Sequence, residues 1–135
     1  MSYVLRPIGI IRSSLTRPED APMQGHEGAP DAWVDVDPAF ADALDSTAPG
    51  DEIILITWLH EARRDILKVH PRDDKKVPLT GVFATRSQDR PNPLGLHRVR
   101  VLEMAGNKLK VGPLEAIDGT PVVDVKPVLS RSADS

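Results

Sequence analysis

The segment Leu94-Gly95-Leu96-His97-Arg98-Val99-Arg100-Val101-Leu102-Glu103-Met104 has the alternating pattern of a β-strand that is buried on one face. Apolar side chains recur along it, and charged side chains stand between them. The phase of the alternation slips once, near His97-Arg98, which predicts a β-bulge at that point. Gly106-Asn107 then turns the chain into Leu109-Lys110-Val111. The pattern predicts two strands joined by a tight turn.

The rest of the chain is also divided into short pieces, because thirteen prolines and nine glycines interrupt it. Short apolar runs between such residues favour strands over long helices. Asp118-Gly119 joins the runs Leu114 to Ile117 and Val122 to Val128, which is a strong hairpin signal. Asp37-Pro38 predicts a short helix over Ala39 to Leu44, since Asp caps helices and proline suits the first helical position. The other expected strands are Val4 to Ile11, Trp33 to Val36, Glu52 to Leu59, Ile66 to Val69 and Gly81 to Ala84.

These elements predict an all-β fold, a small β-barrel of short strands with one short helix and long loops. A length of 135 residues fits one domain, which we assign to residues 1–129, followed by a C-terminal tail over 130–135. No apolar run is long enough for a membrane span, and the first residues lack the pattern of a secretory signal. The chain has no cysteine, so a disulfide framework is excluded and a cytoplasmic location is expected.

Charge is segregated along the chain although the net charge is only -3. Arg17 to His60 contains ten acidic residues against Arg17 alone, whereas Glu61 to Lys110 contains twelve Lys and Arg against six Asp and Glu. One interpretation is a pair of differently charged solvated faces. The other is that the basic half faces a polyanion such as a nucleic acid.

Several enzyme motifs are missing from the sequence. Gly25-His26-Glu27-Gly28 does not complete a dinucleotide-binding glycine pattern, and no phosphate-binding loop is present. His60-Glu61 continues without the second histidine of a zinc protease helix, and the four histidines show no metal-ligand spacing. No serine stands in a nucleophile-elbow context. The sequence therefore disfavours hydrolases and metalloenzymes, and we expect no metal.

The loop Thr85 to Leu96 is unusual because Pro91 and Pro93 flank Asn92, which leaves few backbone states. A stiff loop that carries Arg86, Arg90 and an amide between apolar strands is typical of functional loops. The alternative is a rigid surface turn in which Asp89 pairs with an arginine. Charged residues in the last hairpin, Asp118, Asp124 and Lys126, likewise suit either function or an exposed ion pair.

Three stretches together resemble the TrmO family, also called TsaA-like or YaeB-like. They are Gly81-Val82-Phe83-Ala84-Thr85-Arg86-Ser87, Arg90-Pro91-Asn92-Pro93-Leu94-Gly95-Leu96, and Asp118-Gly119-Thr120-Pro121-Val122-Val123-Asp124-Val125-Lys126-Pro127. Ile8 to Ser14 and Trp58-Leu59-His60 match as well, so the resemblance runs from about Tyr3 to Val128. It departs from the family at Met23, where an arginine is usual, and at Val128, where a tyrosine is usual.

The resemblance implies an S-adenosylmethionine-binding β-barrel that forms homodimers and methylates the N6 position of a modified adenosine beside the tRNA anticodon. It implies cofactor contacts at Pro22, Met23, Gln24, His60, Glu61, Arg86, Leu96, Ile117, Asp118, Gly119 and Thr120. Arg86 is the best candidate for the methionine carboxylate. Arg90 and Asn92 are candidates for substrate contacts, and no catalytic base is identified. Longer family members carry an additional C-terminal domain. The alternative function is a barrel that binds the cofactor but serves a small molecule or a regulatory role.

Overall fold

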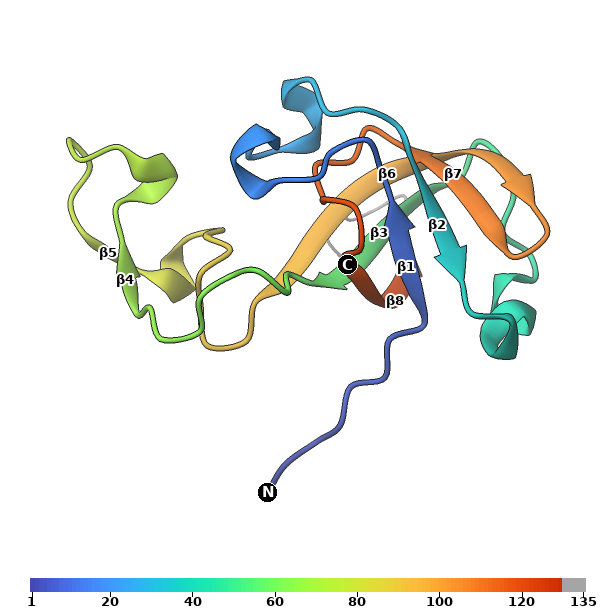
Figure 1. Ribbon diagram of the computed structural model, residues 1–135, viewed down its shortest axis with the longest axis horizontal. Coiled ribbons are helices and arrows are strands. Elements are labelled where there is room, and N and C mark those ends of the chain that lie inside the picture. Colours follow the sequence, from blue (N-terminus) through green and yellow to red (C-terminus); the bar gives the residue numbers. More distant parts are fainter. Residues whose placement is uncertain (130–135) are drawn as a thin grey trace.

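The structure is a computed structural model that describes residues 1–129, and the expected tail over 130–135 lies outside the described residues. Six antiparallel strands close into a barrel in the order β1-β2-β7-β6-β3-β8, which confirms the predicted all-β class (Figure 1). They are β1 (Gly9–Arg12), β2 (Ala32–Val36), β3 (Glu52–Trp58), β6 (Leu94–Ala105), β7 (Lys108–Gly112) and β8 (Pro121–Pro127). Closure pairs every strand on both sides over part of its length, which limits free sheet edges.

The barrel interior is filled by aliphatic side chains. Ile11, Leu55, Val101 and Val111 are fully buried, and Val34 is 1% exposed. Leu114 adds a buried side chain from the segment that follows β7. Such a packed interior is expected for a barrel of this size, which has room for side chains but not for a channel.

The helix expected after Asp37 is present as the 3-10 helix η3 (Pro38–Leu44), the longest of five in the described residues. The Asp37 carboxylate accepts a hydrogen bond from the Ala39 N–H at 2.9 Å, as the capping argument predicts. The other four are single turns that no sequence pattern predicts: η1 (Pro18–Asp20), η2 (Gly25–Glu27), η4 (Pro71–Asp73) and η5 (Val82–Ala84).

The predicted bulge at His97-Arg98 is wrong. The pairing of β6 with β3 runs without a slip from Leu94 to Arg100, and the irregularity lies opposite β7, between Val101 and Glu103. The inward-facing residues of β6 are Gly95, His97, Val99 and Val101, whereas Leu94 and Leu96 point outward and are more than 40% exposed. Two exposed leucines and one buried histidine invert the polarity pattern locally, which imitates a change of phase.

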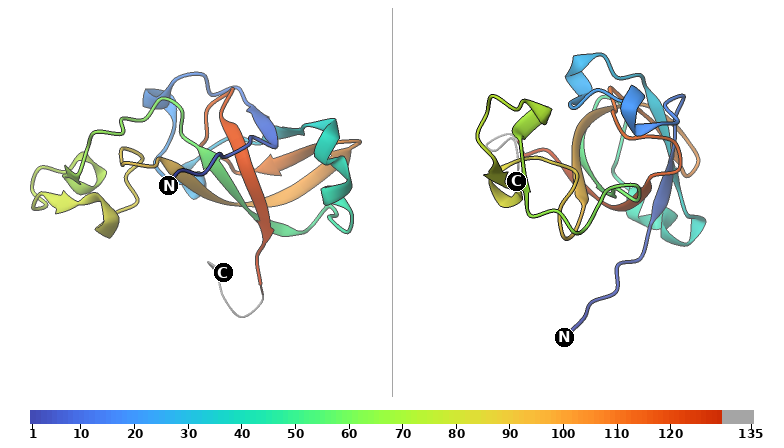
Figure 2. Two further views of the ribbon diagram at one scale, coloured as in Figure 1. Left: turned by 90° about the horizontal axis from the view of Figure 1, so that it is seen from below. Right: turned by 60° about the vertical axis from the view of Figure 1, so that its left-hand side comes forward.

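Residues 61–93 form a lobe that projects from one end of the barrel (Figures 1 and 2). Its only strands are the short pair β4 (Lys68–Val69) and β5 (Thr80–Gly81). The strand expected over Gly81 to Ala84 is therefore wrong beyond Gly81, because the chain turns into η5. The Val82 carbonyl there accepts the Thr85 N–H, a bond within the turn rather than across a sheet.

The first and last predicted strands also differ from the structure. β1 begins only at Gly9, and the residues before Ile8 run away from the barrel as an arm (Figure 1). Leu114 to Ile117 is not a strand, since the Leu114 N–H bonds Pro30 and no hairpin forms with β8. β8 instead pairs with β3 and β1. The Asp118-Gly119 turn is present, with a Gly119 φ of 85° that suits glycine.

Candidate functional site

One edge of β6 is left uncovered by the barrel. The Val101 N–H donates to Asp51, and the Val101 carbonyl accepts the Gly50 N–H. The backbone N–H and C=O groups of the odd-numbered residues of β6 therefore point toward β3. The N–H and C=O groups of Leu96 and Arg98 therefore face the opposite way. The partner on that side, β7, ends at Gly112 opposite Arg100, and no strand of residues 1–129 continues the pairing. Within residues 1–129, the backbone donors and acceptors of Leu96 and Arg98 on this side are therefore not paired with a strand.

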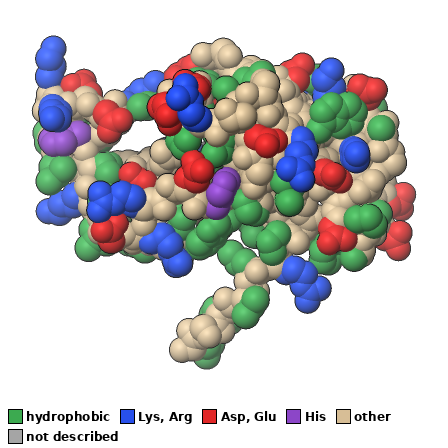
Figure 3. Space-filling model, in the orientation of Figure 1, with side chains coloured by type: hydrophobic (Ala, Val, Ile, Leu, Met, Phe, Trp, Pro, Cys, Tyr) green, Lys and Arg blue, Asp and Glu red, His purple; other side chains and the backbone are tan. Residues whose placement is uncertain are grey.

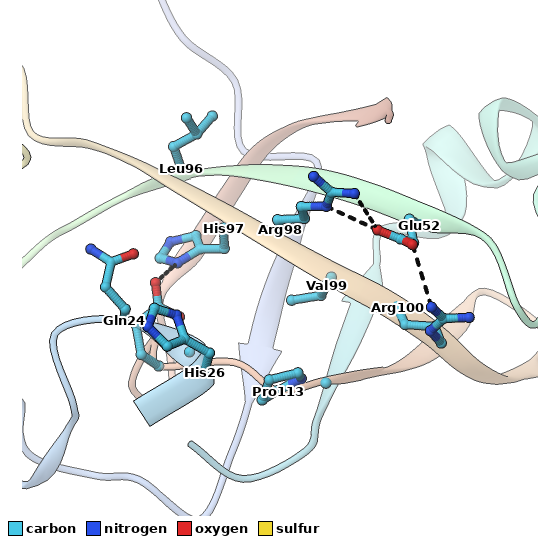
Figure 4. Close-up of a pocket in the computed structure, with 12 residues that line it drawn as sticks. Gln24, His26, Glu52, Leu96, His97, Arg98, Val99, Arg100 and Pro113 are labelled. Carbon is cyan, nitrogen blue, oxygen red and sulfur yellow. Dashed lines mark hydrogen bonds and ion pairs between the residues drawn. The ribbon is translucent and has the colours of Figure 1, made fainter. Parts of the chain in front are cut away.

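An open pocket of about 350 Å³ lies along this edge. Its opposite wall comes from η2 and from Pro113, which follows β7 (Figure 4). Binding sites for small molecules commonly have volumes of this order. The residues that line it are Gln24, Gly25, His26, Glu52, Leu96, His97, Arg98, Val99, Arg100, Gly112, Pro113 and Glu115.

A chain of two short hydrogen bonds connects the barrel interior with the pocket. Thr57 Oγ1 lies 2.7 Å from His97 Nε2, and His97 Nδ1 lies 2.5 Å from Glu115 Oε1. Thr57 is fully buried and the His97 side chain is 5% exposed, whereas the Glu115 side chain is 16% exposed. Since the carboxylate accepts, Nδ1 donates to it, and the unprotonated Nε2 accepts the Thr57 hydroxyl proton. The arrangement fixes one tautomer of the imidazole.

Two glycines make room for this chain of bonds. A Cβ on Gly95 would lie 2.6 Å from His97 Nε2, and a Cβ on Gly25 would lie 3.0 Å from Glu115 Oε2. Gly25 therefore brings η2 against the carboxylate oxygen that His97 does not use. Gly25 and Glu115 both line the pocket, so Oε2 lies beside the backbone of the first loop there.

The outer rim of the pocket carries a charged cluster. Glu52 accepts hydrogen bonds from Arg98 at 2.7 Å and from Arg100 at 3.3 Å (Figure 4). The hydrogen bond from Arg98 and its positive charge lower the pKa of the Glu52 carboxyl. All three side chains are exposed to solvent, so this cluster adds little stability but sets the charge at the mouth of the pocket.

Of the residues that the resemblance assigns to the cofactor, Gln24 and Leu96 line the pocket. They are far apart in the sequence and lie on opposite walls, on the first loop and on β6. Pro22 and Met23 directly precede Gln24, and the Met23 side chain is 47% exposed.

The Ile117 to Thr120 segment lies outside the pocket lining. Asp118 accepts the Ser13 N–H through its side chain, and the Gly119 N–H donates to Ile11. The Thr120 hydroxyl donates to the Ile117 carbonyl at 2.7 Å. These bonds fix the turn between the end of β1 and the start of β8. Asp118 is thus engaged in positioning backbone, through a partner that no local sequence pattern indicates.

His60, Glu61 and Arg86 lie toward the lobe. His60 and Glu61 follow β3 in an exposed turn, and Arg86 is exposed on the loop after η5. None of the three lines the pocket. The residues predicted for the cofactor are therefore divided between the barrel and the lobe of one chain.

The two proposed substrate residues make contacts within the stiff loop. The Arg90 guanidinium donates to the carbonyls of Val82, Thr85 and Ser87 at 2.8–3.1 Å. Arg64 holds the other side of the loop by donating to the carbonyl of Pro91 and to Asn92 Oδ1.

The expected pairing of Asp89 takes an unexpected form, because Asp89 accepts the backbone N–H of Arg63. Arg64 also stacks over the Trp58 ring, with its guanidinium carbon 5.1 Å from the ring centroid. The loop is thereby attached to the residues that follow β3.

His97 and Glu115 are site residues that the sequence does not single out. Glu115 stands in a segment whose pattern predicts a strand, and His97 reads as one of the polar residues of an alternating pattern. One signal is present in the sequence, since the apparent phase slip falls at His97. Among residues 1–129, no group of three His, Cys, Asp or Glu side chains is arranged to hold a metal ion. No helix in that part of the chain is long and apolar enough to cross a membrane.

Comparisons with known proteins place the chain beside others of the same architecture. The family model for the tRNA-methyltransferase O N-terminal domain matches residues 10–135. A relative from Methanothermobacter thermautotrophicus, named "Probable S-adenosyl-L-methionine-binding protein", is 41% identical over 127 residues, which cover 94% of this chain and 90% of the relative. A relative from Archaeoglobus fulgidus, named "S-adenosyl-L-methionine-binding protein", is 40% identical over a match that covers 91% of this chain and 87% of the relative.

A solved structure of TrmO from Pseudomonas aeruginosa is similar with a TM-score of 0.78 and 28% identity. The match covers all of this chain but 61% of that one, so the chain spans about three fifths of the length of the solved protein.

Proposed function

The chain belongs to the family described as the tRNA-methyltransferase O N-terminal domain, and from that premise we propose that it binds S-adenosylmethionine and methylates tRNA. The proposed acceptor is the N6 position of a modified adenosine next to the anticodon. The observation that carries the proposal is the pocket on the open edge of β6, which brings Gln24 and Leu96 together.

The residues of this pocket fit the chemistry of S-adenosylmethionine. The N–H and C=O groups of Leu96 and Arg98 on the side away from β3 suit the alternating donors and acceptors of an adenine edge. The carboxylate of Glu52 at the rim suits a positively charged group. Outside the pocket lining, the guanidinium of Arg86 suits a carboxylate. When bound, the cofactor supplies an electrophilic methyl group. The chain then has to position a nucleophile in line with that group, and positioning alone contributes about 7–11 kcal/mol in favourable cases.

The Lys and Arg side chains of the lobe favour a polyanionic substrate. Figure 3 shows Lys and Arg side chains along its outer edge. Arg63 is paired with Asp65, and Arg72 with Glu27, at 2.8 Å in both cases. Lys68, Lys75 and Lys76 are exposed, and no ion pair of residues 1–129 occupies them. These lysines are available to the phosphates of an RNA backbone.

A homodimer is part of the proposal. The residues assigned to the cofactor are divided between the barrel and the lobe. The lobe of a second copy is the simplest source of the cofactor residues that the pocket lacks. The lobe carries apolar side chains that a partner would cover, with Phe83 84% and Leu67 67% exposed. Light scattering at micromolar concentration should give twice the mass of one chain, and a mass of 14.7 kDa would argue against the dimer. We place the protein in the cytoplasm, where tRNA is found.

A second candidate function is cofactor binding without RNA methylation. It is favoured by the relatives that this chain covers almost completely, since their names mention S-adenosylmethionine binding alone. Transfer of labelled methyl groups from S-adenosylmethionine into total tRNA, isolated from a strain that lacks the gene, separates the two. Label in tRNA supports the methyltransferase. Cofactor binding in calorimetry with no label in tRNA favours the second candidate.

A further inference from the structure

The Thr57–His97–Glu115 hydrogen-bond chain is a set of buried polar groups that the proposed positioning of cofactor and nucleophile leaves unused. Its outer member, Glu115, lines the same pocket as Gln24 and Leu96. We propose that Glu115 is the proton acceptor of the methyl transfer, and that His97 and Thr57 are the residues that position it. The inference rests on the proposed function and names the base that the sequence leaves open.

Methyl transfer to an N–H nucleophile releases one proton. The nitrogen lone pair forms the bond to the methyl carbon while the methyl–sulfur bond breaks, which leaves a neutral thioether. The nitrogen then carries one proton too many and has to lose it to a base. Glu115 lines the pocket, and its Oε1 is engaged by His97 at 2.5 Å, so Oε2 is the oxygen that remains to accept the proton.

The inner members of the hydrogen-bond chain, His97 and Thr57, hold the carboxyl group of Glu115 in place while it carries that proton. After transfer, the proton resides on Glu115 Oε2, and the His97 Nδ1–H still donates to Oε1 at 2.5 Å. His97 Nε2 in turn accepts the Thr57 hydroxyl proton over 2.7 Å, which keeps the imidazole in one orientation. Burial of Thr57 and His97 keeps water from competing for these bonds.

Other charged groups near His97 and Glu115 have to be considered in any pH measurement. They are His26 from η2, Glu52 from β3, and Arg98 and Arg100 from β6. Glu52 is held by both arginines. His26 lines the same pocket as Glu115, so a variant at His26 is needed as a control.

The test combines single-turnover methyl transfer to tRNA from the deletion strain with calorimetry of S-adenosylmethionine binding. Glu115→Gln should slow the transfer by roughly 100-fold or more, the range of general base catalysis, and leave cofactor affinity unchanged. The wild-type rate should rise with pH, as expected for a reaction that needs an unprotonated general base, and Glu115→Gln should lack this rise. His26→Asn and Glu103→Gln, which alter groups outside the chain of hydrogen bonds, should keep it.

Thr57 and His97 provide a second set of variants. Thr57→Val removes the hydroxyl at nearly constant volume and should shift the pH profile, whereas Thr57→Ser should restore it. In nitrogen NMR of the imidazoles, His97 should show a proton on Nδ1, and His97→Asn identifies its signal. If Glu115→Gln does not fold, Glu115→Asp takes its place. It keeps a carboxylate but draws it back from the nucleophile, so the rate should fall.

Four outcomes overturn the inference. The first is a Glu115 variant that transfers methyl groups at the wild-type rate. The second is an NMR spectrum in which His97 carries its proton on Nε2. Parallel loss of cofactor binding and transfer in Glu115→Gln makes Glu115 a cofactor contact instead. A wild-type protein that binds the cofactor but methylates no tRNA overturns the proposed function. The role of Glu115 as proton acceptor is then overturned as well, because it rests on that function.

Discussion

Thr57 Oγ1 stands where a Cβ atom on Gly95 would collide with it. The two residues face each other across β3 and β6, in register. A side chain at position 95 would also meet His97 Nε2 at 2.6 Å. The Thr57–His97 hydrogen bond is therefore possible because residue 95 has no side chain, and this steric limit explains the glycine near the end of the loop Thr85 to Leu96.

Gly95→Ala should destabilise the protein by about 1–3 kcal/mol, because overpacking forces neighbouring side chains or backbone to move. It should also break the Thr57–His97 hydrogen bond. Urea unfolding measures the first effect, and NMR of the His97 ring measures the second. Gly81→Ala is the matched control, since nothing lies within 4 Å of a Cβ there and its φ is not positive. Equal stability of the two variants would contradict a steric role for Gly95.

The barrel is predictable from sequence because its strands lie between prolines and glycines and alternate in polarity. β2, β3, β7 and β8 agree with prediction to within about two residues. The predicted strand over Gly81 to Ala84 is wrong because the chain turns there, and the Arg90 guanidinium binds the carbonyls of Val82, Thr85 and Ser87 within the same loop. An apolar run predicts a strand and does not indicate that its carbonyls bind a side chain.

The candidate site is predictable only in part. Gln24 and Leu96 follow from the resemblance, and the pocket contains both. The phase of β6 is misleading, since its buried histidine needs two hydrogen-bond partners that lie 40 residues before it and 18 residues after it. Partners at such separations depend on the barrel closure, which a sequence pattern does not specify.

Arg90 is expected to act on the loop and not on the substrate directly. Arg90→Lys keeps the charge but cannot donate to three carbonyls at once, so stability should fall by about 1–3 kcal/mol. Hydrogen exchange of the backbone over 82–90 should become faster. An unchanged exchange rate, together with weaker tRNA binding, would instead make Arg90 a substrate contact.

Arg86→Ala should weaken S-adenosylmethionine binding by about 1.5–3 kcal/mol, the range for a hydrogen bond to a charged group. Calorimetry on the wild type and the variant measures the difference, and we expect one site per chain in both. Arg72→Ala is a control on the same lobe, because Arg72 pairs with Glu27 and is not among the predicted cofactor contacts. Equal reductions in affinity for the two variants would indicate a general effect of the lobe.

Glu52→Gln should destabilise the protein at neutral pH but not in acid. The pKa of Glu52 lies below its ordinary value of 4.5 because of the hydrogen bond and charge of Arg98. A lowered folded pKa means stability that is present above the ordinary value and is lost as the pH falls through the folded value. Urea unfolding in low salt should therefore show a difference between wild type and variant that disappears on acidification. Glu103→Gln on the neighbouring strand β6 is the matched control for the loss of one negative charge.

Binding of tRNA should depend on Lys68, Lys75 and Lys76. The other lobe cations are less suitable for reversal, since Arg64 holds the stiff loop and Arg63 is paired with Asp65, which raises the pKa of Arg63. The three lysines are exposed on the lobe, so their reversal to Glu should leave folding and cofactor binding intact. Affinity for tRNA should fall. The slope of log affinity against log salt should become shallower by up to about 0.9 unit for each phosphate that the variant no longer neutralises.

The matched control for this reversal changes the same number of charges on the barrel, at Arg12, Lys108 and Lys126. Filter binding over a range of salt concentrations compares the two triple variants with the wild type. If both weaken binding equally, net charge and not the lobe determines affinity. If neither does so and binding is independent of salt, the basic segment is a solvated face. The candidate function without RNA methylation then accounts better for the pocket, because a small-molecule site needs no cationic surface beside it.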